Sequence, residues 1–127
     1  MGKADERGSH PRPLTVDVHR LPAGDVVVVR VAGDLVAQAT PAMRQAVGNE
    51  LRRSPGQLVV DLSLVTRVDT EGVDALALCA QLAGESDISF CLAGGDVGPV
   101  SRALEAAELT ELFEVFSSID EATNGRR

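Results

Sequence analysis

The chain has 127 residues, a length that fits one compact domain with a single hydrophobic core. Its formal net charge is -7 and its cations are nearly all arginines scattered along the sequence, so it lacks the concentrated basic face that binding to nucleic acid requires. Its longest apolar stretch is well short of the roughly 20 residues that a membrane-spanning helix needs. We therefore expect neither nucleic-acid binding nor membrane insertion.

Residues 1–13 are charged and contain two prolines, without the apolar core of a signal peptide. We interpret them as a flexible tail ahead of a single domain over residues 14–124, with residues 125–127 as a C-terminal tail. Leu14 to Arg20 alternates apolar and polar residues, which predicts an edge strand with one solvated face. The β-branched run from Val26 to Gly33 predicts a buried strand that ends at the glycine.

From Thr40 onward the pattern alternates between helices and strands. Thr40 and Pro41 predict a helix start, with Thr40 as the N-cap and Pro41 as the first helical residue. The later predicted elements are a strand over Gln57–Leu62, a helix from about Thr70 to Ala83, a strand over Ile88–Ala93, a helix after Pro99, a short strand around Leu112–Phe116 and a short helix from Ser118. This order indicates an α/β domain with a small sheet.

The sequence offers no pattern typical of a metal site. His10 and His19 lie in the predicted tail and first strand, and Cys79 and Cys91 lie on two different predicted core elements, so a zinc site is not expected. Buried cysteines are ordinary core residues, and we interpret both in this way. A redox pair remains the alternative.

Catalytic motifs are also missing. The glycine-rich loop from Gly94 to Gly98 is followed by Pro99, where a Walker-type phosphate loop needs Lys and then Ser or Thr. We interpret it as a turn. A nucleophile elbow is absent, and no histidine lies near the end of an apolar strand. We therefore expect a protein that is not an enzyme, with no catalytic residue and no cofactor.

The most informative segment is the turn Asp69-Thr70-Glu71-Gly72, between a buried strand and the second predicted helix. A helix N-terminus exposes unpaired N–H groups and partial positive charge, which stabilise an anion by roughly 0.3–1 kcal/mol. Asp69 or Thr70 fits the cap, and Glu71 lies in the first turn, where acids are common. Glu71 is thus either an ordinary first-turn acid or a regulatory residue, and the pattern leaves both open.

Three stretches resemble, in order and spacing, the STAS domain and specifically the stand-alone bacterial anti-sigma-factor antagonists; they are VRVAGDLVAQATPAMRQAV, VVDLSLVTRVDTEGVDALALCAQLA and VSRALEAAELTELFEVFSSIDEA. The resemblance covers almost everything from Leu14 onward. It implies an α/β, STAS-like single domain: a small mixed sheet of about five strands with about four helices packed against it. It also implies a cytoplasmic protein that binds an anti-sigma factor, usually a serine kinase of GHKL type, and so releases a sigma factor.

Two positions depart from the pattern of that family. Its turn commonly reads Asp-Ser-Ser-Gly, with the second Ser as phosphoacceptor, and the equivalent residue here is Glu71. An acid often follows the leucine after the second-strand glycine, whereas here Leu35 is followed by Val36. A phosphate carries about -1.5 to -2 charge, so Glu71 would imitate it permanently but only partly. Thr70 is the remaining phosphoacceptor candidate, because scaffold-type STAS proteins of stress-signalling assemblies resemble this turn with one Ser or Thr directly after the Asp.

The resemblance implies a partner-binding surface formed by the loop after the second strand, the Asp69 turn and the exposed side of the second helix. The residues expected there are Asp34, Val36, Gln38, Thr40, Asp69, Thr70, Glu71, Gly72 and Asp74. Two alternatives keep the fold and change the partner: a scaffold subunit of a stress-signalling assembly, and a regulatory subunit of a lipid-transport ATPase complex. Some STAS domains are said to bind nucleotide, and the oligomeric state stays open.

Overall fold

The computed structural model of the chain describes residues 12–22 and 25–124. Its strands form one sheet in the order β1-β2-β3-β4-β5. β1 pairs antiparallel with β2, whereas β2, β3, β4 and β5 pair in parallel. The strand bounds are Thr15–Leu21 for β1, Val26–Leu35 for β2, Gln57–Val68 for β3, Ser89–Ala93 for β4 and Val115–Phe116 for β5. The small mixed sheet is confirmed, and β1 is an edge strand as its alternating pattern predicts.

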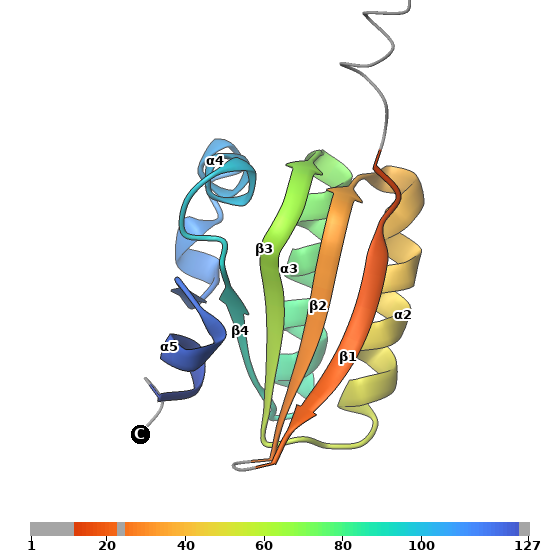
Figure 1. Cartoon of the computed structure of the whole chain (residues 1–127), viewed down its shortest axis with the longest axis vertical. Coiled ribbons are helices and arrows are strands. Elements are labelled where there is room, and N and C mark those ends of the chain that lie inside the picture. The colour runs from red at the N-terminus through yellow and green to blue at the C-terminus, as the bar shows by residue number, and fades with distance from the viewer. Residues whose placement is uncertain (1–11, 23–24, 125–127) are drawn as a thin grey trace, which may run out of the picture.

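In the described residues, four α-helices accompany this sheet. They are α2 (Thr40–Leu51), α3 (Thr70–Glu85), α4 (Pro99–Ala106) and α5 (Ile119–Asn124), with short 3-10 turns η1 (Ala37–Ala39) and η2 (Thr110–Leu112). Behind β1, β2 and β3, α2 and α3 lie side by side, whereas α5 lies near β4 (Figure 1). None of the helices in the described ranges is both long enough and apolar enough to cross a bilayer.

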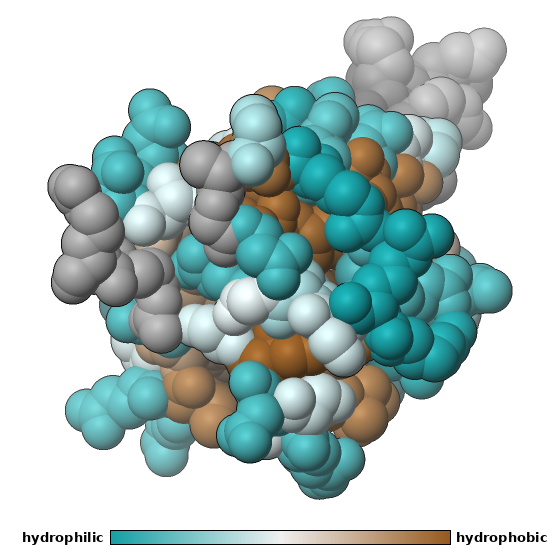
Figure 2. Space-filling view, turned by 90° about the horizontal axis from the view of Figure 1, so that it is seen from below, coloured by the Kyte–Doolittle hydropathy of each residue, from teal (hydrophilic) through white to brown (hydrophobic). Residues whose placement is uncertain are grey.

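The valine-rich run of β2 is buried on both faces of the sheet, which explains its continuous apolar pattern. Val27 and Val29 belong to the larger core cluster, which also holds the helix residues Met43 and Leu76. Val28 faces the other way, into a smaller cluster that includes Ala122 of α5. The end of the molecule that lies lowest in Figure 1 has a mostly hydrophilic surface, with smaller hydrophobic areas between polar side chains (Figure 2).

The two cysteines lie on opposite faces of the sheet. Cys79 of α3 is in the larger cluster, and Cys91 of β4 is in the smaller one, beside its registered neighbour Val59. Burial raises the pKa of the Cys79 thiol to about 11, although the Arg44 guanidinium opposes this, so this thiol stays protonated near neutral pH. Both cysteines are core residues, and a redox pair between them does not fit this fold.

Several predicted boundaries were wrong. β2 continues through Gly33, and β3 continues past Leu62 to Val68, with register shifts between the two strands near these extensions. Past Leu62 most residues of β3 are exposed, and Leu64 is 56% exposed. The sequence there no longer shows the continuous apolar run that indicates a buried strand. The predicted strand over Leu112–Phe116 is confined to its last two residues, after η2.

Thr40 is not the N-cap of α2. The helix begins at Thr40 itself, and Ala39 is the cap residue without a capping side chain. The Thr40 hydroxyl instead donates to the Ala37 carbonyl at 3.1 Å, because the preceding residues are already wound into η1.

Candidate functional site

The loops that follow β2 and β3 meet at one end of the sheet. These strands are adjacent and parallel, and Leu35 is in register with Val68. η1 therefore begins beside the start of α3, at the upper end of the molecule (Figure 1). The Asp69 N–H donates to the Leu35 carbonyl at 3.3 Å and extends this pairing into the turn. We call this region the docking end: residues 34–40 together with residues 66–74.

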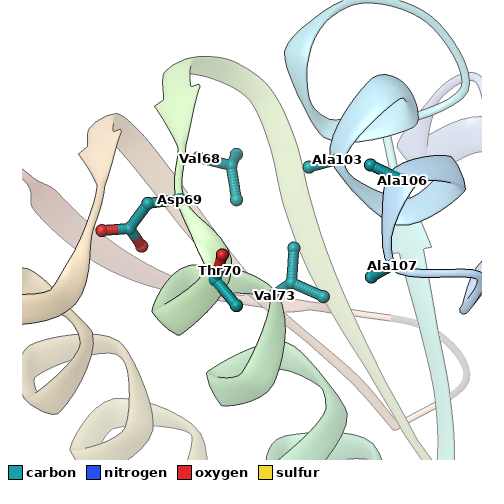
Figure 3. Close-up of a pocket in the computed structure, with 7 residues that line it drawn as sticks. All are labelled: Val68, Asp69, Thr70, Val73, Ala103, Ala106 and Ala107. Atoms are coloured by element: carbon teal, nitrogen blue, oxygen red, sulfur yellow. The ribbon is translucent and has the colours of Figure 1, made fainter.

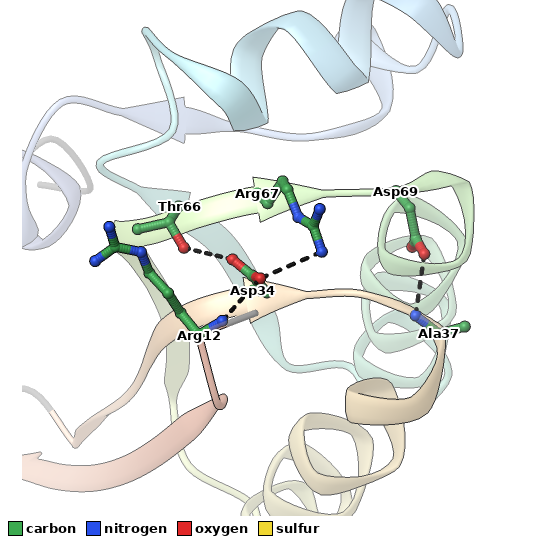
Figure 4. Close-up of polar contacts among 6 residues, drawn as sticks. All are labelled: Arg12, Asp34, Ala37, Thr66, Arg67 and Asp69. Atoms are coloured by element: carbon green, nitrogen blue, oxygen red, sulfur yellow. Dashed lines mark hydrogen bonds and ion pairs between the residues drawn. The ribbon is translucent and has the colours of Figure 1, made fainter. Parts of the chain in front are cut away.

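Asp69 is the N-cap of α3 and also holds η1 in place. One carboxylate oxygen accepts a hydrogen bond from the Gly72 N–H at 2.8 Å, and the other accepts one from the Ala37 N–H at 3.1 Å (Figure 4). A capping oxygen satisfies one of the N–H groups that a helix start leaves unpaired. Of the two caps that the sequence leaves open, the structure has Asp69 and not Thr70.

Gly72 is buried where α3 passes over the end of β2. An added Cβ would lie 2.3 Å from the Leu35 carbonyl oxygen and 3.1 Å from Val68 Cγ1. The nearer atom belongs to the backbone and cannot rotate away. Gly72 therefore allows the close approach of the helix to the strand. It was predicted to lie on the partner-binding surface, but it is buried inside the fold.

Thr70 and Glu71 are both exposed in the first turn of α3. They border two different grooves. Glu71 lines a shallow groove of about 170 Å³ between α2 and α3, together with Arg44 and Asp74. Thr70 lines a larger groove of about 380 Å³ between α3 and α4, where Val68, Val73, Ala103, Ala106 and Ala107 form the apolar walls (Figure 3).

Asp34 is only 5% exposed, and its carboxylate has several internal partners. It accepts hydrogen bonds from the Thr66 hydroxyl at 2.6 Å and the Arg12 N–H at 3.0 Å, and Arg67 Nη2 lies 3.3 Å away (Figure 4). The Thr66 hydroxyl and then the Arg12 N–H lower the pKa of Asp34, with the Arg67 and Arg12 charges adding to them against the effect of burial. The carboxylate is thus held ionised inside the fold.

The segment ahead of β1 crosses the end of β2 at this point. The Asp34 N–H donates to the Arg12 carbonyl at 3.0 Å, and a Cβ on Gly33, whose φ is +100°, would lie 2.3 Å from the Pro13 carbonyl oxygen. Arg12 and Pro13 therefore lie against β2. Residues 1–11 of the predicted tail are outside the described ranges.

The nine residues predicted for the partner surface lie at the docking end, but they differ in accessibility. The exposed ones are Gln38, Thr70, Glu71 and Asp74; the half-buried ones are Val36 and Asp69; the buried ones are Asp34, Thr40 and Gly72. Sequence reasoning missed Arg67, which lines a third groove of about 380 Å³ with Val36, Gln38, Val68 and Asp69. The only sign of this residue in the sequence is that a cation stands two positions before Asp69, the N-cap of α3.

The arrangement is suited to binding. Asp34 is buried and Asp69 is half-buried, and both carboxylates accept internal hydrogen bonds. Within the described residues there is no group of three or more His, Cys, Asp or Glu side chains that could hold a metal ion. What the docking end presents outward is a set of shallow grooves with charged rims.

Comparison with known proteins places this geometry in a family. Residues 20–122 match the family model described as the STAS domain. Two curated relatives from strains of Mycobacterium tuberculosis, each named anti-sigma-F factor antagonist RsfB, are 29% identical over 119 residues, 94% of this chain and 94% of theirs.

Solved structures agree with this assignment. An anti-sigma factor antagonist from Mycobacterium paratuberculosis superposes with a TM-score of 0.79 and 28% identity, covering 92% of this chain and 97% of that one. The Bacillus cell fate determinant SpoIIAA in its phosphorylated form has a TM-score of 0.65 and 15% identity, over 89% of this chain and 100% of that one. At that identity the second likeness shows the fold alone.

Proposed function

The chain belongs to the STAS-domain family, and from this premise we propose that it is an anti-sigma-factor antagonist, a cytoplasmic protein that binds an anti-sigma factor and so releases a sigma factor. The relatives that carry this name match almost the whole chain, including both halves of the docking end. The function is binding, not catalysis.

The observation that carries the proposal is the exposed acid at the start of α3. Glu71 is the second residue of the helix, directly after Thr70 and before the buried Gly72, and it is exposed. By the family resemblance this is the position of the phosphoacceptor serine. A side chain placed there is accessible both to a docking protein and to the enzyme that would modify it.

We propose further that Glu71 replaces the usual switch by a fixed charge. A carboxylate near a helix N-terminus is stabilised as a phosphate would be, but it carries about half of the phosphate charge and is always present. Binding would then not be turned off by phosphorylation at position 71. If Glu71 were only a favourable first-turn acid, its replacement would leave partner affinity unchanged.

The partner that we propose is an anti-sigma factor of the GHKL serine-kinase type, with Thr70 as the remaining phosphoacceptor. The Thr70 side chain is exposed at the mouth of the groove between α3 and α4. A phosphate on Thr70 would lie beside the Glu71 carboxylate, and repulsion between the two would add to the change at the surface.

The direct test is a calorimetric titration of the protein with anti-sigma factors from the same genome, with and without ATP, for the wild type and for Glu71→Ser. We expect the wild type to bind, and the serine variant to become phosphorylated and lose affinity only when ATP is present. Mass spectrometry would report whether Thr70 is modified in either protein.

The matched control is Glu85→Ser, which removes the same charge from an exposed position at the other end of α3. Its response to ATP should equal that of the wild type. An identical ATP response for Glu71→Ser and the wild type would refute the fixed-charge proposal, and failure of the wild type to bind would refute the antagonist function. Recovery of a transporter ATPase would instead favour the lipid-transport alternative.

A further inference from the structure

The third groove at the docking end carries a charge that the family pattern does not account for. It lies between η1 and the end of β3 and is lined by Val36, Gln38, Arg67, Val68 and Asp69. The side chain of Arg67 is 59% exposed, so its guanidinium is accessible from solvent along the rim of this groove.

Arg67 is held in position by a carboxylate that cannot easily move. The side chain of Asp34 is 6% exposed and lies 3.3 Å from Arg67 Nη2, and it is fixed by the Thr66 hydroxyl and the Arg12 N–H (Figure 4). A guanidinium carries five N–H donors in a planar fork, more than the ion-pair contact of Nη2 with Asp34 can use.

The other acid in this groove does not compete for the arginine. Both oxygens of Asp69 accept backbone N–H groups, from Gly72 and from Ala37, and they lie at the positive end of α3. Arg67 is the cation among the residues that line this groove, and Val36 and Val68 add apolar surface to its lining.

Stability alone explains this pair poorly. An ion pair with a largely exposed partner contributes about 0–1 kcal/mol to the free energy of unfolding. A partly exposed arginine that a buried acid positions is instead suited to recognition. Its guanidinium is already oriented before binding, so it can donate two parallel hydrogen bonds to a carboxylate with little further loss of side-chain entropy.

We propose that this groove receives an acidic side chain of the anti-sigma factor, with Arg67 as the contacting residue and Asp34 as the positioning residue. The inference rests on the proposed function for the identity of the partner. Charge complementarity selects the occupant: the exposed guanidinium of Arg67 lines this groove, and a guanidinium pairs best with a carboxylate. One arginine is not the concentrated basic face that nucleic acid requires.

The test compares the affinity of the anti-sigma factor for the wild type, Arg67→Gln and Arg67→Lys at low and high salt. Arg67→Gln should weaken binding about tenfold, equivalent to about 1.4 kcal/mol, and should flatten the salt dependence. Arg67→Lys should lose less, because it keeps the charge but not the fork. The control is Arg53→Gln, an exposed arginine just after α2, which changes net charge equally and should bind as the wild type does.

A double-mutant cycle then separates positioning from structure. Asp34→Asn should weaken binding in the wild type, yet add almost nothing in the Arg67→Gln background, because Asp34 acts through Arg67. Unchanged affinity and salt dependence for Arg67→Gln, with normal binding by the wild type, would overturn this inference alone. Absence of wild-type binding would overturn the proposed function and this inference with it.

Discussion

Strands β2 and β3 are joined by two Arg–Asp ion pairs that have different roles. Arg30 pairs with Asp61 at 3.0 Å and Asp34 pairs with Arg67 at 3.3 Å, and each pair joins residues in register. In both, the acid is buried and the arginine is partly exposed, 40% for Arg30 and 59% for Arg67. The polarity is reversed between the strands.

Their surroundings make the difference. Asp61 accepts the Ser63 N–H at 3.0 Å in the middle of β3, so that pair fixes the strands to each other. Asp34 lies after the register shift beside Gly33 and holds both the segment ahead of β1 and the arginine at the rim of a groove. The same chemistry supports the sheet at one position and a binding surface at the other.

The largest expected effect on stability comes from comparing two glycines of α3. Gly72 lies at the docking end, and Gly84 lies at the far end of the helix. Gly72→Ala should lower the free energy of unfolding by about 3 kcal/mol, the upper end of overpacking costs, because the Leu35 carbonyl oxygen lies 2.3 Å from the new Cβ. Gly84→Ala, with nothing within 4 Å of its Cβ, should stabilise the helix by up to about 1 kcal/mol. Urea unfolding measures both.

The next effect concerns the cap that joins the two loops. Asp69→Ala should cost about 1–2 kcal/mol, because the Gly72 and Ala37 N–H groups both lose their acceptor. Asp69→Asn should cost less, since its single amide oxygen can still accept one of the two. Because Asn is itself a good N-cap, wild-type stability of Asp69→Asn, in unfolding followed by circular dichroism, would show that the link to η1 adds no stability.

A smaller effect should appear at acid pH. The pKa of Asp34 is lowered in the folded state, first by the Thr66 hydroxyl, whereas an unfolded Asp titrates near about 3.9. Its contribution to stability is therefore present above about pH 4 and is lost as pH falls through the lowered pKa. Urea midpoints measured between about pH 6 and about pH 3 should fall more steeply for the wild type than for Asp34→Asn. Parallel profiles would contradict this.

The smallest stability effect compares the two ion pairs directly. Arg30→Gln and Arg67→Gln should each change the free energy of unfolding by less than about 1 kcal/mol, because both arginines are partly exposed. Only Arg67→Gln should weaken partner binding. If Arg30→Gln weakened binding to the same extent, the distinction between a sheet-supporting pair and a docking pair would be lost.

The sequence predicts most of the fold, because the informative patterns are local. The alternation in β1, the β-branched run of β2 and the Asp69 turn each mark their elements within a few residues. The start of α2 was misassigned by one residue, since η1 winds the chain before Thr40 and no side-chain pattern marks such a turn.

The candidate site is less accessible to sequence reasoning because its contacts join distant segments. Asp34 reads as an exposed acid after a glycine, yet it is buried because Arg12 and Thr66, 22 and 32 positions away, supply its hydrogen bonds. In the sequence, Arg67 reads as an ordinary solvent-facing cation between the predicted strand Gln57–Leu62 and the Asp69 turn. Only the pairing of β2 with β3 brings Arg67 and Asp34 together.

The central claim is that the end of the molecule around the start of α3 is where an anti-sigma factor binds. Amide hydrogen exchange of the protein, alone and saturated with the factor, tests it most directly. We predict added protection over residues 34–40 and 66–78, with little change in β1 and at the far end of α3. Protection confined to β1, α5 or the last turn of α3, with residues 66–78 exchanging as they do without the factor, would contradict the account.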